Sequence, residues 1–222
     1  MASKAQQFHS RLLHQFSSTN RESNAAALTA YFGLKSSKPF DGSFFETYST
    51  QDTDPNRIQP ADLVAVTLLS MEIRRESRSG ISTANVLLLE KLEPQISRLL
   101  SRIPKNRELH TLSNREFERY LGDASPASRL FGVLRNDAKM HRVATYKLLA
   151  RKRPNLLPIR DSVAEKVLGS SPTWWRSWHH ALTTEPSLAF ELRKIRSEAA
   201  KSNKKISKLS LLRVADIAIW NS

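Results

Sequence analysis

Hydrophobic residues recur every three or four positions along most of the chain, which is the period of an α-helix. Phe8, Leu12, Leu13 and Phe16 define the apolar face of the first predicted helix. The same periodicity predicts helices near residues 23–31, 60–73, 86–103, 113–122, 126–134, 143–153, 162–169, 172–182, 186–201 and 209–220. Residues 35–56 are rich in Ser, Asp, Gly and Pro and are expected to form a long loop, with a short hairpin as the alternative. The pattern therefore predicts an all-α protein.

Polar and special residues suggest where several of these helices begin and end. The segments 19–22 and 113–116 both read Ser or Thr, two residues, then Glu, which is the pattern of a helix-opening capping box. Pro60 suits a first helical position, whereas Pro94 is expected to break or restart its helix. Gly169 is expected to close the helix that starts near residue 162.

Length and composition favour one folded domain of 222 residues, with a lobe boundary near residues 110–125. The longest apolar runs fall well short of the roughly 18 residues of a membrane span, and residues 1–16 lack the apolar stretch of a secretory signal. There is no cysteine, which excludes disulfides and thiolate chemistry. These observations lead us to expect a cytoplasmic protein without a membrane partner.

Positive charge is concentrated in one third of the chain. Residues 139–213 contain 17 Lys and Arg against 5 Asp and Glu, so this third carries +12 of the total net charge of +14. A charge asymmetry of this size favours a polyanionic partner, of which nucleic acid is the simplest.

The densest cluster lies in the string 147–161, KLLARKRPNLLPIRD. It reads as a helix end, three consecutive cations, an apolar crossing between Pro154 and Pro158, and Asp161 at the start of the next helix. The three cations suit the negative end of a helix dipole, so a solvated helix end is one interpretation. Phosphate binding is the other, because residues 193–208 add seven further cations.

Asp161 and the tryptophans each have two interpretations. Asp is a preferred N-cap, so Asp161 is expected to cap the helix from Ser162, although a carboxylate beside a basic surface could also orient a water. Trp174 and Trp178 share a helix face, which favours core packing over base stacking. The histidines lack metal-ligand spacing, and no phosphate-cradling glycine loop is present, so we expect no metal and no cofactor.

The middle of the chain resembles the core of the helix-hairpin-helix DNA glycosylase superfamily. The resemblance rests on residues 143–149, VATYKLL, and on the Pro-apolar-x-Asp segment 158–161, PIRD, and it covers roughly residues 130–169. The string LLARKRP followed by PI-D, with LLRVAD at 211–216, is also similar to a family of uncharacterised bacterial proteins. The hairpin position reads KMHR at 139–142, without glycine, and the place of the lyase-type lysine is taken by Val143.

The resemblance implies an all-α, two-lobed fold and a duplex DNA partner. It places Asp161 as the catalytic carboxylate of a monofunctional enzyme that removes a modified, flipped-out base. The predicted phosphate contacts are Lys139, Arg142, Lys147, Arg151, Lys152 and Arg153. The alternative is a non-catalytic interaction module whose basic face binds nucleic acid or an acidic protein.

Overall fold

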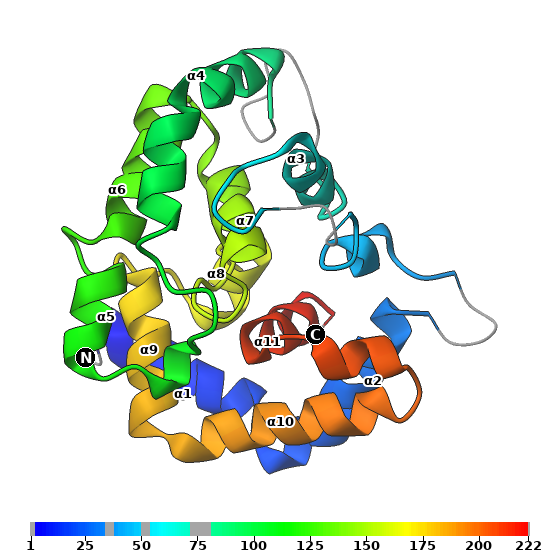
Figure 1. Cartoon of the computed structure of the whole chain (residues 1–222). Coiled ribbons are helices and arrows are strands. Elements are labelled where there is room, and N and C mark those ends of the chain that lie inside the picture. The colour runs from blue at the N-terminus through cyan, green and yellow to red at the C-terminus, as the bar shows by residue number, and fades with distance from the viewer. Residues whose placement is uncertain (1–2, 34–37, 50–53, 72–80, 222) are drawn as a thin grey trace. The chain divides into compact units, whose positions relative to one another are not determined.

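The computed structural model describes residues 3–33, 38–49, 54–71 and 81–221 (Figure 1). These residues fold into helices joined by turns, without a β-sheet, so the predicted all-α class is confirmed. Helix α3 spans Pro60–Thr67. Ile73, which was predicted to continue its apolar face, lies outside the described residues.

The chain divides into two compact units. The terminal unit contains residues 1–40, 109–111 and 158–222, and the central unit contains residues 41–108 and 112–157. Residues 109–111 lie at the edge of the segment where the sequence suggested a lobe boundary, and the chain also passes between the units at 40–41 and 157–158. The two ends of the chain therefore build one unit together.

The terminal unit is a bundle of six helices among the described residues. Its helices are α1 (Lys4–Gln15), α2 (Arg21–Tyr31), α8 (Ser162–Leu168), α9 (Trp174–Thr184), α10 (Pro186–Ala200) and α11 (Leu211–Trp220). Three short helical turns, η1 (Ser18–Asn20), η3 (Leu109–Thr111) and η5 (Lys204–Lys208), complete it. Helix α10 runs along α2, and α11 packs on both of them and on α8 (Figure 1).

The tryptophans of α9 belong to the core of the terminal unit. Trp174 and Trp178 are each 2% exposed, and the ring of Phe8 on α1 meets them edge-on at 5.2 and 5.9 Å between ring centroids. Phe8, Leu12 and Phe16 are buried, as the periodicity predicted, whereas Leu13 on the same predicted face is only half-buried. Core packing is therefore confirmed for this pair of tryptophans.

The central unit surrounds a helix that is buried on every side. Its elements are η2 (Asp41–Phe44), α3, α4 (Thr83–Leu100), α5 (Asn114–Leu121), α6 (Pro126–Gly132), the π-turn η4 (Val133–Asp137) and α7 (Arg142–Lys152). Every residue from 144 to 150 on α7 is buried, and α3 and α6 pack against this helix. Helix α6 also contacts α4 and α5.

Two predicted helix boundaries are wrong. Pro94 lies inside α4, which continues unbroken to Leu100, because Leu89, Ile96 and Leu100 are all buried along one face. Burying each such side chain contributes about 1.5–3 kcal/mol, which together exceeds the cost of about 3 kcal/mol for an interior proline. The capping box at 19–22 is absent, because a 3₁₀ turn precedes α2 and its N-cap, Asn20, makes no side-chain cap bond.

The other boundary signals are confirmed. Ser113 and Glu116 form a reciprocal capping box at the start of α5, and Pro60 and Pro126 occupy first-turn positions of α3 and α6. Gly169 ends α8 with φ of +86°, a left-handed conformation that glycine adopts without strain.

Candidate nucleic-acid interface

Helix α7 ends in three consecutive cations that point into the central unit. Its C-cap, Arg153, leaves the helical region at φ −137° and ψ 64°, and Pro154 follows. Lys152 and Arg153 are only 6% and 1% exposed. We name Arg151, Lys152 and Arg153 the inner cluster. Its burial does not fit the interpretation as a solvated helix end, so the bonds that hold it decide its role.

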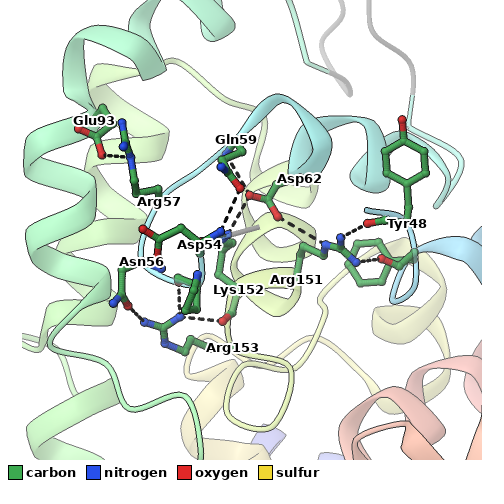
Figure 2. A network of polar contacts seen from close by, with 12 residues as sticks. Tyr48, Asp54, Asn56, Arg57, Gln59, Asp62, Glu93, Arg151, Lys152 and Arg153 are labelled. Carbon is green, nitrogen blue, oxygen red and sulfur yellow. Dashed lines mark hydrogen bonds and ion pairs between the residues drawn. The ribbon is translucent and has the colours of Figure 1, made fainter. Parts of the chain in front are cut away.

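Lys152 pairs with a buried carboxylate. Its Nζ lies 2.8 Å from Oδ2 of Asp62 and donates a second bond of 2.7 Å to the carbonyl of Asp54 (Figure 2). Asp62 is 1% exposed and sits in the first turn of α3, where the same oxygen accepts from the backbone N–H of Gln59. Burial lowers the pKa of Lys152 from its ordinary value, and the hydrogen bond to Asp62 opposes that shift.

Arg153 joins three segments of the central unit. Its Nε donates to the carbonyl of Ile103 (2.7 Å), one terminal nitrogen donates to Pro55 (2.7 Å), and the other donates to the side chain of Asn56 (2.8 Å) and the carbonyl of Leu100. Burial lowers the pKa of Arg153 to about 10, and the nearby Asp54 opposes this. The planar fork of arginine explains how one side chain satisfies so many carbonyls.

Arg151 fastens the η2 region to α7. Its guanidinium donates to the carbonyls of Phe45 and Tyr48, and its Nε lies 3.5 Å from Oδ1 of Asp62 (Figure 2). The guanidinium also lies 5.9 Å from the centroid of the Phe45 ring. Arg151 and Lys152 therefore approach the two oxygens of one carboxylate.

Lys147 is also turned inward. It is 6% exposed, and its Nζ donates 2.7 Å to the carbonyl of Leu69. Buried cations whose protons already meet protein oxygens are poorly placed to contact a phosphate. The predicted phosphate contacts of Lys147, Arg151, Lys152 and Arg153 thus do not fit their surroundings, which indicate a structural role in the central unit.

Lys139 lies in the turn that enters α7, and Arg142 is the first residue of that helix. Lys139 is exposed and has φ of +54°, so a lysine adopts the left-handed conformation for which glycine is the usual residue. The turn is held by Arg135, which donates to the carbonyl of Met140, and by Asn85, which donates to the carbonyl of Ala138. The turn thus forms without the missing glycine, and Lys139 points to solvent while Arg142 is half-buried.

Asp161 caps α8, as the sequence predicted. Its Oδ1 accepts from the backbone N–H of Ala164 at 2.9 Å, and its own backbone is extended. The preceding residues are fixed from α9, because the indole of Trp174 donates to the carbonyl of Ile159 at 3.0 Å. Asp161 belongs to the terminal unit, whereas the six predicted phosphate contacts belong to the central unit.

Six of the exposed cations of the basic third lie on α10, at its C-cap and on η5. We name them the cationic strip; its members are Arg193, Lys194, Lys201, Lys204, Lys205 and Lys208. Arg196 is the exception in this run, because its guanidinium donates 2.6 Å to the carbonyl of Leu209 and ties the end of η5 to α10. Ile206 of η5 is fully buried and holds this turn against the terminal unit.

The acids near the cationic strip are neutralised by ion pairs. Glu191 accepts two hydrogen bonds of 2.8 Å from the guanidinium of Arg21 on α2, and Glu198 pairs with Lys201 one helical turn away. The hydrogen bonds from Arg21 lower the pKa of Glu191. Glu198 thus neutralises one member of the strip, Lys201, and the other five cations of the strip present a positive field to solvent.

The sequence reasoning did not single out Asp62. Its signal was present, because Gln59-Pro60-Ala61-Asp62 has an acid at the third helical position, where a carboxylate bonds back to the N-cap. That pattern predicts a capped helix but says nothing about cations some 90 positions later in the chain.

The described residues offer neither a metal site nor a membrane-spanning helix. They contain no group of three His, Asp or Glu side chains that could hold a metal ion. They also contain no helix with both the length and the apolar character that crossing a membrane requires.

Comparison with known proteins places the chain in a family without assigning it an activity. No curated protein and no solved structure matches the sequence. Residues 24–222, which include the inner cluster, Asp161 and the cationic strip, match the model of a family of unknown function. The chain therefore belongs to a family of unknown function, DUF6308.

Proposed function

We propose that this protein binds nucleic acid through the cationic strip of its terminal unit. The observation that carries the proposal is the exposure of six Lys and Arg side chains on two consecutive elements, α10 and η5. Phosphate contacts from such side chains supply most of the sequence-independent affinity for DNA and RNA.

The surface proposed here lies on α10 and η5, whereas the sequence predicted phosphate contacts on and next to α7. The inner cluster contributes to the folding of the central unit, and the charge excess of residues 139–213 is therefore split between a buried and an exposed part. Only the exposed part is available to a polyanion. Two further exposed cations of this third lie outside the strip, Lys139 in the central unit and Lys166 on α8.

Salt dependence of binding tests the proposal. Fluorescence anisotropy of a labelled duplex, followed from low to moderate salt, should give a log–log slope near −5 if all six cations contact phosphates, since each contributes about −0.9. The triple variant Lys204→Ala/Lys205→Ala/Lys208→Ala should reduce the magnitude of that slope by about 2.7.

A matched control is available on the central unit. Lys91, Arg98 and Arg102 are also exposed, and they lie on or just after α4 in a segment that carries Glu90 and Glu93 as well. Changing these three to alanine removes the same charge and should leave the slope close to wild type. An equal loss in both triple variants would show general attraction without an interface, and a flat wild-type slope would refute nucleic-acid binding. Tight binding of an acidic protein by the same strip, with a flat slope on DNA and RNA, would favour the interaction-module alternative.

A further inference from the structure

The outward face of α10 carries one aromatic ring among its cations. Phe190 is 51% exposed, and Arg193, Lys194 and Lys201 follow it at spacings of three, four and eleven residues, which place all four on one face of the helix. The opposite face is buried and consists of Leu188, Ala189, Leu192, Ile195 and Ala199. Burial of that face fixes the rotation of α10 about its axis, so Phe190 faces solvent.

The face of the Phe190 ring is accessible, because the ammonium of Lys194 lies over it. The Nζ of Lys194 lies 4.3 Å from the centroid of the ring. An exposed cation–π contact of this kind is worth a factor of about 2 to 5 in an equilibrium constant, whereas stacking of one base on an aromatic ring is worth about 5 to 150. The gain from stacking a base on Phe190 thus exceeds the loss of the contact with Lys194, and the displaced ammonium is then free to pair with a phosphate.

The setting of Phe190 differs from that of the other exposed rings of the terminal unit. Phe40 and Trp220 lie 6.1 Å apart edge-on, and Phe40 also stacks on Tyr31 at 5.6 Å, so these rings form a small aromatic cluster with one another. Phe190 has cations as its neighbours on the helix face. An isolated exposed phenylalanine needs no explanation, but one with two cations, Arg193 and Lys194, on the next turn of the same face has the composition of a nucleotide-stacking surface.

We infer that α10 and η5 bind an unpaired nucleic-acid strand, with a base stacked on Phe190 and the backbone following the cationic strip. This inference rests on the proposed function and specifies its partner. Stacking requires a base face that is open, and in a duplex those faces are covered by neighbouring bases. An anionic membrane fits less well, because the outward face of α10 offers a single large apolar side chain, and interfacial helices bury a broad apolar face.

The test compares an oligothymidylate of about 15 nucleotides, which cannot pair with itself, with a duplex of equal length. Phe190→Ala should weaken binding of the single strand about 5- to 150-fold and change duplex binding much less. Phe190→Tyr should restore single-strand binding, because it keeps a ring of the same size. Phe190→Leu should behave like the alanine variant, since it keeps apolar area without a stacking face. The control is Leu87→Ala, which removes an exposed apolar side chain from α4 in the other unit and should bind as wild type does.

The outcomes separate this inference from the proposed function. If Phe190→Ala binds the single strand as wild type does while the lysine triple variant loses its salt slope, the cationic strip binds nucleic acid but the stacking inference is wrong. Equal losses on single strand and duplex, or full binding by Phe190→Leu, would also overturn it. Tighter binding to phosphatidylserine-containing vesicles than to the oligonucleotide would replace the nucleic-acid partner with a membrane surface. If neither salt nor the triple variant affects binding, the proposed function itself fails.

Discussion

The Nζ of Lys152 lies 2.8 Å from the carboxylate of Asp62 in the interior of the central unit. The two side chains are 3% and 1% exposed, and Arg151 approaches the other carboxylate oxygen at 3.5 Å. The pair connects the end of α7 with the start of α3 across 90 residues of chain, and it converts what reads as a surface cluster into a buried one.

Removing the carboxylate should strongly destabilise the protein. Asp62→Ala leaves Lys152 and Arg151 buried beside each other without their counter-ion, and losing one partner of a buried pair costs about 3–5 kcal/mol. Urea unfolding followed by circular dichroism measures the free energy of unfolding. The double variant Asp62→Leu/Lys152→Met should lose less stability than the sum of the losses in Asp62→Leu and Lys152→Met, by about 0.5–3 kcal/mol. Strict additivity would show that the two side chains do not interact.

Arg153 should not tolerate replacement by lysine. The guanidinium donates from all three nitrogens to oxygens that include the carbonyls of Ile103, Pro55 and Leu100, and an ammonium cannot reach them together. Arg153→Lys should lower the free energy of unfolding by about 2–3 kcal/mol, the range for a lost hydrogen bond to a charged group. Arg102→Lys, on an exposed side chain, is the control and should change stability little. Equal effects of the two substitutions would contradict the buried network.

The sequence predicted the helices but could not predict which way the cations point. Helical periodicity and capping are local properties, so α5, α6 and α8 begin where their Ser and Asp residues indicate. Helix α7 is buried all round, and a helix without a polar face carries no periodic signal that separates an inward lysine from an outward one. The partner of Lys152 is Asp62, and only the folded chain brings the two together.

The position of the candidate interface was predictable only as far as it depends on local sequence. The basic third of the chain could be recognised from charge alone, and on α10 the buried positions leave Arg193, Lys194 and Lys201 outside. The role of Arg196 was not predictable, because its bond to the carbonyl of Leu209 depends on how η5 folds back. Pro94 was misread since the packing of α4 outweighs one lost backbone bond.

The Arg21–Glu191 pair should make stability depend on acid pH. Hydrogen bonds from Arg21 lower the pKa of Glu191, so the folded chain binds fewer protons than the unfolded chain near pH 4. The resulting stabilisation is present above the ordinary glutamate pKa and is lost as the pH falls through the lower, folded value. Glu191→Gln should therefore flatten the plot of unfolding free energy against pH between about pH 5 and pH 3. Glu90→Gln, on the exposed side of α4, is the control; an unchanged plot for Glu191→Gln would contradict the pair.

The left-handed turn at Lys139 predicts that glycine is better there. A non-glycine residue at φ of +54° carries a cost of about 1–2 kcal/mol, and part of the gain from glycine is offset by the greater freedom of its unfolded state. Lys139→Gly should raise the free energy of unfolding by about 0.5–1 kcal/mol, whereas Lys139→Ala keeps the strain and should not. If Lys139 also contacts a phosphate, both variants should reduce the magnitude of the salt slope by about 0.9.

Asp161 can be tested separately as a cap and as a catalytic group. Asparagine and serine are N-caps comparable to aspartate, so Asp161→Asn and Asp161→Ser should keep wild-type stability, while Asp161→Ala should lose about 0.5–2 kcal/mol. Thermal unfolding of the three variants measures this order. Base removal, which the resemblance to DNA glycosylases implies, needs the carboxylate and not only the cap. Release of a base from a panel of lesion-containing duplexes by the wild type, lost in the fully folded Asp161→Asn variant, is the outcome expected of catalysis. Absence of release by the wild type, or undiminished release by Asp161→Asn, would leave Asp161 with the single role of holding the first turn of α8.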